Sequence, residues 1–152
     1  MDSKKVIDDE IEAIHQRYAK RDLMNNKNNY SLLNPAYMME AQERERSLIS
    51  MLSPLAPLEN KKIIEVGCGD GDKILQLIKF GFSPKNIVGN ELLPNSIKKA
   101  KKSLPNTVSL LEGDATQLEI EKESFDIIYQ SVVFSSILDD DLQNKLAQKI
   151  WG

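Results

Sequence analysis

The sequence of 152 residues is poor in side chains that hold metals or form cross-links. It contains one cysteine, Cys68, and one histidine, His15. A single cysteine excludes an internal disulfide, and two soft ligands are too few for a zinc site. The His-Glu-x-x-His pattern of zinc peptidases does not occur either. We therefore expect no metal in this chain.

Long apolar runs and an excess of positive charge are also lacking. No apolar run approaches the ~18 residues of a membrane span, and the first residues are charged, without the apolar stretch of a signal peptide. Lys and Arg total 20 against 23 Asp and Glu, which gives a net charge of −3. This balance offers no basic surface to nucleic acid. We expect a cytoplasmic protein that binds neither membranes nor nucleic acids.

Residues 1–60 are predicted to form a helical N-terminal cap. Apolar residues at spacings of four, three and four predict a helix over about 4–20; they are Ile7, Ile11, Ile14 and Tyr18. Asn34 followed by Pro35 is typical of a helix start, and the apolar pattern after it predicts a second helix to about residue 53.

Residues 61–152 alternate between strand and helix patterns. Strands are expected at 62–66, 86–90, 107–111 and 125–130, and helices at 72–80, 95–103 and 140–150. Repeated strand-helix units require a parallel sheet covered by helices. The predicted class is therefore α/β with a Rossmann-like sheet, whose ligand crevice lies beyond the carboxyl ends of the strands.

A glycine turn joins the first strand of this sheet to the first helix. Residues 65–71 read Glu-Val-Gly-Cys-Gly-Asp-Gly. Alternate glycines let the backbone approach a ligand closely, and the amides that open the helix favour polar or anionic groups. The sixth loop position, which is glycine in dinucleotide-binding turns, is Asp72, and the lysine of a phosphate loop is absent. Hydride chemistry and nucleotide triphosphate hydrolysis are thus disfavoured.

The pattern Glu65-x-Gly67-x-Gly69-x-Gly71 resembles motif I of the class I S-adenosylmethionine-dependent methyltransferases. The resemblance places Cys68 in the cofactor turn and implies S-adenosylmethionine as the methyl donor. It gives Glu91, which closes the second strand 24 residues after Gly67, the role of binding the ribose hydroxyls. Leu92 would then lie against the adenine. A surface carboxylate and a core leucine are the alternatives.

Two later segments extend the resemblance. Asp114 and Ala115 follow the third strand and look like the family's adenine clamp, although Asp114 could also be a turn former beside Gly113. Gln130 ends the fourth strand, where the family holds the methionine moiety. The apolar run 132–138 would wall the active site or pack in the core.

The N-terminal segment has a resemblance of its own. Residues 17–22, 30–35, 42–46 and 133–136 look like those of methyltransferases encoded with polysaccharide and natural-product biosynthesis genes. That resemblance implies a sugar or other small-molecule acceptor, methylated at oxygen. Tyr18, Arg21 and Tyr30 would cap the cofactor, with Arg21 pairing with its carboxylate, or would serve only in packing and at the surface. His15 is the candidate general base, with a solvated helix histidine as the alternative.

The family fold has seven strands, whereas this sequence stops after the helix that follows the fourth, so the resemblance implies a truncated domain. The segment from Phe125 to Ser131 would then be an open sheet edge, and we expect a second copy or a partner chain to cover it. Two hypotheses follow: a methyltransferase that works as an oligomer or a natural short form, or a catalytically incomplete S-adenosylmethionine-binding subunit or regulator of another chain. A third possibility is that the sequence is a fragment of such a methyltransferase.

Overall fold

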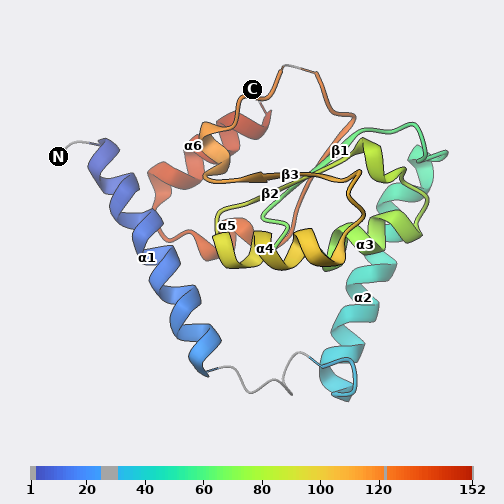
Figure 1. Cartoon of the computed structure of the whole chain (residues 1–152), viewed down its shortest axis with the longest axis horizontal. Coiled ribbons are helices and arrows are strands. Elements are labelled where there is room, and N and C mark those ends of the chain that lie inside the picture. Colours follow the sequence, from blue (N-terminus) through green and yellow to red (C-terminus); the bar gives the residue numbers. More distant parts are fainter. Residues whose placement is uncertain (1–2, 25–30, 122, 152) are drawn as a thin grey trace.

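The computed structural model describes residues 3–24, 31–121 and 123–151. Two long helices come first, α1 (Ser3–Met24) and α2 (Pro35–Leu52), and they flank the rest of the chain in Figure 1. The predicted start of α2 is confirmed, because the Asn34 side chain accepts a hydrogen bond from the Ala36 N–H at 3.1 Å and Pro35 occupies the first turn. This cap satisfies an amide that the helix itself leaves without a partner.

A four-stranded parallel sheet forms the centre of the fold. Its strands are β1 (Ile63–Val66), β2 (Ile87–Glu91), β3 (Ser109–Glu112) and β4 (Ile127–Gln130), in the spatial order β3-β2-β1-β4. The helices between and after them are α3 (Asp72–Lys79), α4 (Pro94–Ser103), α5 (Val133–Ser136) and α6 (Asp140–Trp151). The predicted α/β, Rossmann-like class is confirmed, whereas the short helix α5 was not predicted.

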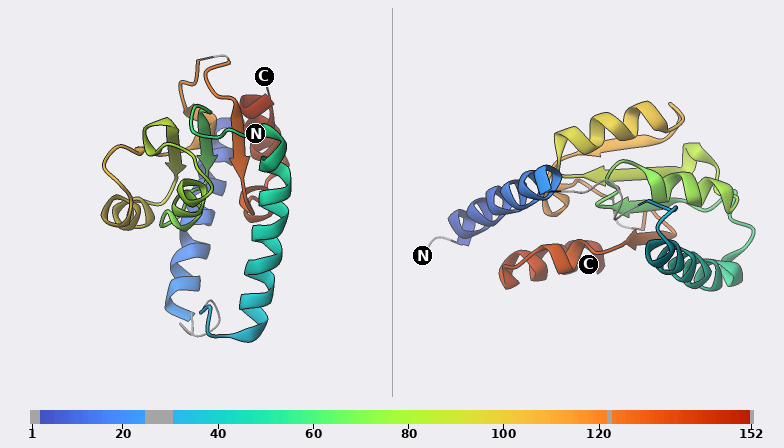
Figure 2. Two further views of the ribbon diagram at one scale, coloured as in Figure 1. Left: turned by 90° about the vertical axis from the view of Figure 1, so that its right-hand side faces the viewer. Right: turned by 90° about the horizontal axis from the view of Figure 1, so that it is seen from below.

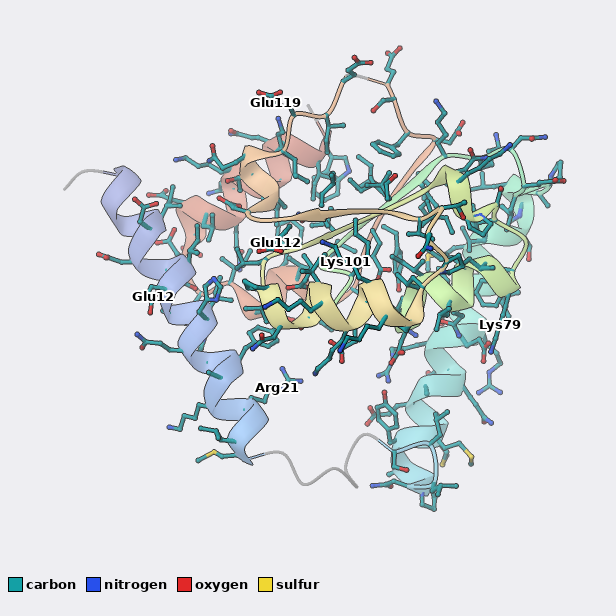
Figure 3. The ribbon with its side chains drawn as sticks, in the orientation of Figure 1. Glu12, Arg21, Lys79, Lys101, Glu112 and Glu119 are labelled. Carbon is teal, nitrogen blue, oxygen red and sulfur yellow. The ribbon has the colours of Figure 1, made fainter. Side chains whose placement is uncertain are left out.

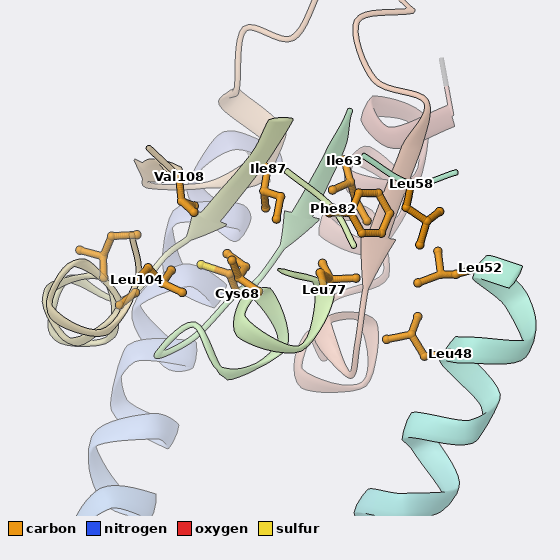
Figure 4. Close-up of a cluster of buried hydrophobic side chains, with 13 residues drawn as sticks. Leu48, Leu52, Leu58, Ile63, Cys68, Leu77, Phe82, Ile87, Leu104 and Val108 are labelled. Carbon is orange, nitrogen blue, oxygen red and sulfur yellow. The ribbon is translucent and has the colours of Figure 1, made fainter. Parts of the chain in front are cut away.

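Helices cover both faces of the sheet, as the two further views show for α4 and α6 (Figure 2). The larger core cluster contains Leu48 and Leu52 of α2, residues of α3 and α4, and Ile63 of β1 (Figure 4). The second cluster joins α1 and α6 to Val66 of β1. Ile63 and Val66 point to opposite faces because successive side chains alternate along a strand. Both N-terminal helices therefore pack on the sheet domain, and their separation as a cap over 1–60 stays a prediction.

The last strand, β4, lies at the edge of the sheet. Within the described chain it pairs with β1, and Ile128 on it is 37 % exposed. An open strand edge presents unpaired backbone donors and acceptors. The sequence correctly placed the segment 125–131 at an edge, and its coverage by a second copy or a partner chain stays a prediction.

Candidate functional site

A cleft opens at the carboxyl ends of the strands. One side consists of the glycine turn after β1, the end of β2 and the loop after β3. The other side consists of α1, α5 and α6. Seven of the residues predicted for the site line this cleft: Tyr18, Gly67, Gly69, Glu91, Leu92, Asp114 and Ala115. The sheet topology thus brings together residues that are up to 97 positions apart, between Tyr18 and Ala115.

The glycine turn is held against β2 and adopts conformations that favour glycine. The N–H groups of Gly67 and Cys68 both donate to the carbonyl of Asn90, at 2.8 and 2.9 Å. Gly67 and Gly69 have φ values of 72° and 55°. A Cβ at Gly67 would collide with the side chain of Val133, whereas a Cβ at Gly69 would meet no atom within 4 Å. The turn therefore packs tightly against α5 at Gly67 and leaves space for a ligand at Gly69.

Glu91 is the best-positioned acceptor in the cleft. Its side chain is only 7 % exposed, and its two carboxylate oxygens accept hydrogen bonds from the N–H groups of Gly69 and Leu93, both at 2.8 Å. These bonds fix the carboxylate between the glycine turn and the start of α4. Each oxygen keeps further acceptor capacity, since an ionised carboxylate has about four lone-pair sites.

The loop after β3 is built around Asp114. Its carboxylate accepts from the Thr116 N–H at 2.9 Å and from the Thr116 hydroxyl at 2.6 Å, so its role as a turn former is confirmed. The loop is also tied to β2, because the Asn90 amide donates to the carbonyls of Leu111 and Gly113 at 3.2 and 2.9 Å. Sequence reasoning did not single out Asn90, although a polar residue inside a strand pattern is a usable signal.

Other predicted residues lie outside the cleft lining. Gln130 accepts from the Val133 N–H at 3.2 Å and so shapes the turn after β4. Arg21 lies on α1 beyond the sheet (Figure 3), with its guanidinium carbon 5.6 Å from the centre of the Tyr18 ring. The remaining predicted residues absent from the lining are His15, Glu65, Cys68 and Gly71. Tyr30 lies outside the described residues.

Glu65 and Cys68 are instead buried beneath the turn. Glu65 is 2 % exposed, and its Oε2 atom has no hydrogen-bond partner. Burial is the main cause that raises the pKa of Glu65 to about 8; the positive charge of Lys73 opposes the rise and the negative charge of Glu91 adds to it. Burial, together with Glu65 and Glu91, raises the pKa of the Cys68 thiol to about 12. The thiol is therefore protonated at neutral pH, which suits packing and not nucleophilic chemistry.

Helix α1 is bound to the segment after β4. Arg17 donates to the carbonyl of Ser136 at 3.1 Å and pairs with Glu10 at 2.7 Å, while Glu10 also accepts from the Leu138 N–H at 2.8 Å. The Tyr18 and Ser136 hydroxyls are 3.1 Å apart and hydrogen-bonded. These contacts join α1 to the segment 136–138 on the side of the cleft opposite the glycine turn.

The described part of the chain offers neither a metal-binding cluster nor a membrane-spanning helix. Its residues contain no cluster of three or more His, Cys, Asp or Glu side chains that could hold a metal ion. None of its helices combines the length and the apolar character that crossing a bilayer requires.

Known proteins resemble this chain in sequence and in fold. A sterol 24-C-methyltransferase of Debaryomyces hansenii is 32% identical over 88 residues, which cover 53% of this chain and 23% of that protein. An eEF1A lysine and N-terminal methyltransferase of Bos taurus is 28% identical over 89 residues, covering 58% and 13%. The chain thus spans about a quarter or less of these relatives' length.

Solved structures of methyltransferases resemble this chain in fold. A TehB-like SAM-dependent methyltransferase from Corynebacterium glutamicum has a TM-score of 0.52 at 26% identity, covering 77% of this chain and 66% of that one. Phosphoethanolamine N-methyltransferase 1 of Haemonchus contortus, solved with S-adenosylhomocysteine, has a TM-score of 0.65 at 19% identity and covers 93% and 29%. Residues 63–151, which include the whole sheet, match the family described as methyltransferase domain, so the chain belongs to that family.

Proposed function

We propose that the chain binds S-adenosylmethionine in this cleft and serves the transfer of its methyl group to a small-molecule acceptor. The observation that carries the proposal is the carboxylate of Glu91, which is fixed at the end of β2 by the Gly69 amide and faces the cleft. A carboxylate in this place can accept hydrogen bonds from both hydroxyls of a ribose.

The other lining residues fit the remaining parts of the cofactor. The space beside Gly69 admits a ligand close to the backbone. The Asp114 carboxylate can accept from an exocyclic amine, and Leu92 and Ala115 offer apolar contacts to a flat base. Tyr18 reaches the cleft from α1. The donor and acceptor set is that of a neutral nucleoside and not of a polyphosphate, for which the described lining provides no lysine or arginine.

When bound, S-adenosylmethionine would supply an electrophilic methyl group on its sulfonium, and the acceptor's electron pair would displace the thioether. The protein's part in such a reaction is to orient the two reactants and to exclude water. The contacts of Arg17 and Tyr18 with Ser136 hold α1 at the cleft, where its apolar residues can help to exclude water.

The relatives and the sequence prediction differ in the atom that is methylated. The sequence prediction was a sugar or other hydroxyl acceptor, which would require a base at hydrogen-bond distance. His15 is not part of the cleft lining, so its role as that base stays a prediction. The named relatives have different acceptors, a sterol carbon in one case and protein amines in the other. They support methyl transfer in general and do not select one of these acceptors.

The open edge of β4 favours a second candidate function, that of a cofactor-binding subunit completed by another copy or another chain. Methyl transfer by the purified protein to any acceptor would argue against completion by a different chain. Light scattering of the purified protein across a concentration series would show whether the edge between Phe125 and Ser131 is covered by self-association; a monomer at every concentration would exclude the second copy.

Calorimetric titration with S-adenosylhomocysteine tests the proposal directly. We expect binding by the wild-type chain and a roughly 10- to 100-fold weaker affinity for Glu91→Gln, because hydrogen bonds to a charged group contribute about 1.5–3 kcal/mol each. Glu112→Gln is the matched control, since Glu112 pairs with Glu91 in the sheet register but is exposed and outside the lining. No binding by the wild type, or equal losses in the two variants, would refute the proposed site.

A further inference from the structure

We propose that the acceptor taken by this cleft is an apolar, uncharged small molecule, held by the wall that α1, α5 and α6 build opposite the glycine turn. The inference rests on the proposed function and narrows its acceptor class. It is carried by the chemistry of the wall, by the charges that the lining lacks, and by one strained valine at the cleft.

The two sides of the cleft differ in chemistry. The glycine turn, Glu91 and Asp114 provide backbone groups and carboxylates. The opposite wall is aliphatic, and its members come from three separate helices and from the loop between α5 and α6: Ile11, Ile14, Val133, Ile137, Leu142 and Leu146. Ile14, Ile137, Leu142 and Leu146 are at the same time buried members of the second core cluster, so Ile11 and Val133 are the more accessible part of this wall. A site that orients a nucleoside on one side and offers hydrocarbon on the other favours a partner with an apolar body.

Charged side chains are confined to the nucleoside side. The described lining contains no lysine, arginine or histidine, and its two carboxylates, Glu91 and Asp114, already bind backbone amides. On the wall, the hydroxyls of Tyr18 and Ser136 bond to each other. A phosphorylated acceptor would find no cation in the described lining, and Arg17 next to it is already paired with Glu10. A sugar would lose its hydration without enough partners in return, at a cost of about 1–3 kcal/mol for each unsatisfied group.

Val132 adds an independent observation. It directly follows Ser131 after β4, lines the cleft, and is 69 % exposed. Its backbone is left-handed, with φ 59° and ψ 10°, a conformation that is costly for a β-branched residue. The hydroxyls of Ser135 and Ser136 both donate to its carbonyl at 2.9 Å and help to hold it there. Glycine or asparagine would adopt this conformation at a lower cost in free energy. We therefore infer that the valine side chain serves to contact a ligand.

The test uses the full chain saturated with S-adenosylhomocysteine, and two probes of opposite character. Geraniol, an isoprenoid alcohol, represents the apolar class, and methyl α-glucoside represents the sugar class. We expect calorimetry to detect geraniol binding to this saturated chain, and no binding of the glucoside. Glucoside binding, or geraniol binding that occurs only in the absence of S-adenosylhomocysteine, would overturn the inference.

A matched pair of variants locates the contact. Val132→Thr keeps the size and the β-branching, and thus the backbone strain, but exchanges a methyl group for a hydroxyl; we expect about 3- to 10-fold weaker geraniol binding. Leu138→Asn is the control, because Leu138 is 70 % exposed in the same segment but does not line the cleft. Equal effects of both variants would mean unspecific adsorption and would overturn the inference.

The same titrations separate the two proposals. Both variants are expected to bind S-adenosylhomocysteine with unchanged affinity, because neither residue touches the predicted nucleoside side. If the wild-type chain binds S-adenosylhomocysteine but does not bind geraniol, only the proposed acceptor class is overturned. Absence of S-adenosylhomocysteine binding overturns the proposed function and the acceptor class with it.

Discussion

Replacement of Glu65 by glutamine should remove a large part of the pH dependence of stability. Glu65 is buried at 2 % exposure in β1, with Oε2 lacking a partner, and its pKa is raised to about 8 by burial first and by the charge of Glu91 second. An unfolded glutamate has the ordinary value of 4.5. The native state thus holds a proton that the unfolded state releases over the interval between these values.

The direction of this pH dependence follows from the number of protons that each state binds. Below pH 4.5 both states are protonated at this site, and the carboxyl causes no pH dependence. Between about 4.5 and 8 the native state binds more protons than the unfolded state, so the free energy of unfolding falls as the pH rises. Each pH unit inside this interval lowers the free energy of unfolding by up to about 1.4 kcal/mol, and the total decrease is roughly 3–5 kcal/mol. Above pH 8 the loss is complete.

Urea unfolding followed by far-ultraviolet circular dichroism at pH 5, 6, 7, 8 and 9 measures the effect. Glutamine does not titrate, so Glu65→Gln should gain stability relative to the wild type by several kcal/mol between pH 5 and pH 9. Glu112→Gln, at an exposed strand end, should follow the wild-type curve. Parallel curves for the wild type and Glu65→Gln would refute the raised pKa, and with it the description of this carboxyl as buried and neutral.

Three further predictions concern the glycine turn. Gly67→Ala should lower the free energy of unfolding, measured in urea, by about 2–5 kcal/mol, because it combines a positive φ with a collision against Val133. Adding Val133→Ala should restore the part of this loss that is due to the collision. Gly69→Ala has open space and should lower the free energy of unfolding by only about 1–2 kcal/mol. Equal losses at the two glycines would contradict the tighter packing at Gly67. At pH 8 the Cys68 thiol of the native protein should react with iodoacetamide roughly a thousandfold more slowly than the thiol of the protein unfolded in urea. The reason is that the pKa of the native thiol is about 12, whereas its ordinary value is 9. A fast reaction of the native protein would show that the turn is open.

Local sequence signals predicted those parts of the fold whose causes lie within a few residues. The apolar spacing that ends at Tyr18 predicted α1, and Asn34 with Pro35 predicted the start of α2. The glycine turn and its position between β1 and α3 followed from glycines at alternate positions. These features depend on helix periodicity, capping and backbone sterics, which short segments specify by themselves.

The wall of the cleft could not be predicted in the same way. The hydrogen bonds from Arg17 and Tyr18 to Ser136 join residues 119 and 118 positions apart. The helix α5 depends on a left-handed Val132, a conformation that no propensity of valine suggests. The sequence did identify the run 132–138 as a wall or as core, and the structure shows that Ile137 serves in both, as a buried member of the second cluster and as part of the lining.

The family resemblance assigned two glutamates, Glu65 and Glu91, to one cofactor, but the sheet gives them different environments. Val66 faces the cleft, and because side chains alternate along β1, Glu65 faces the opposite core beside Lys73. Glu91 instead reaches the lining, with both oxygens bonded to amides that stabilise its charge. If contact with the ligand decides affinity, Glu65→Gln should weaken S-adenosylhomocysteine binding less than Glu91→Gln at pH 7, where the Glu65 carboxyl is already neutral. The reverse order in calorimetry would mean that the turn transmits the state of Glu65 to the ligand, and that the buried carboxyl acts on binding through the backbone of the glycine turn.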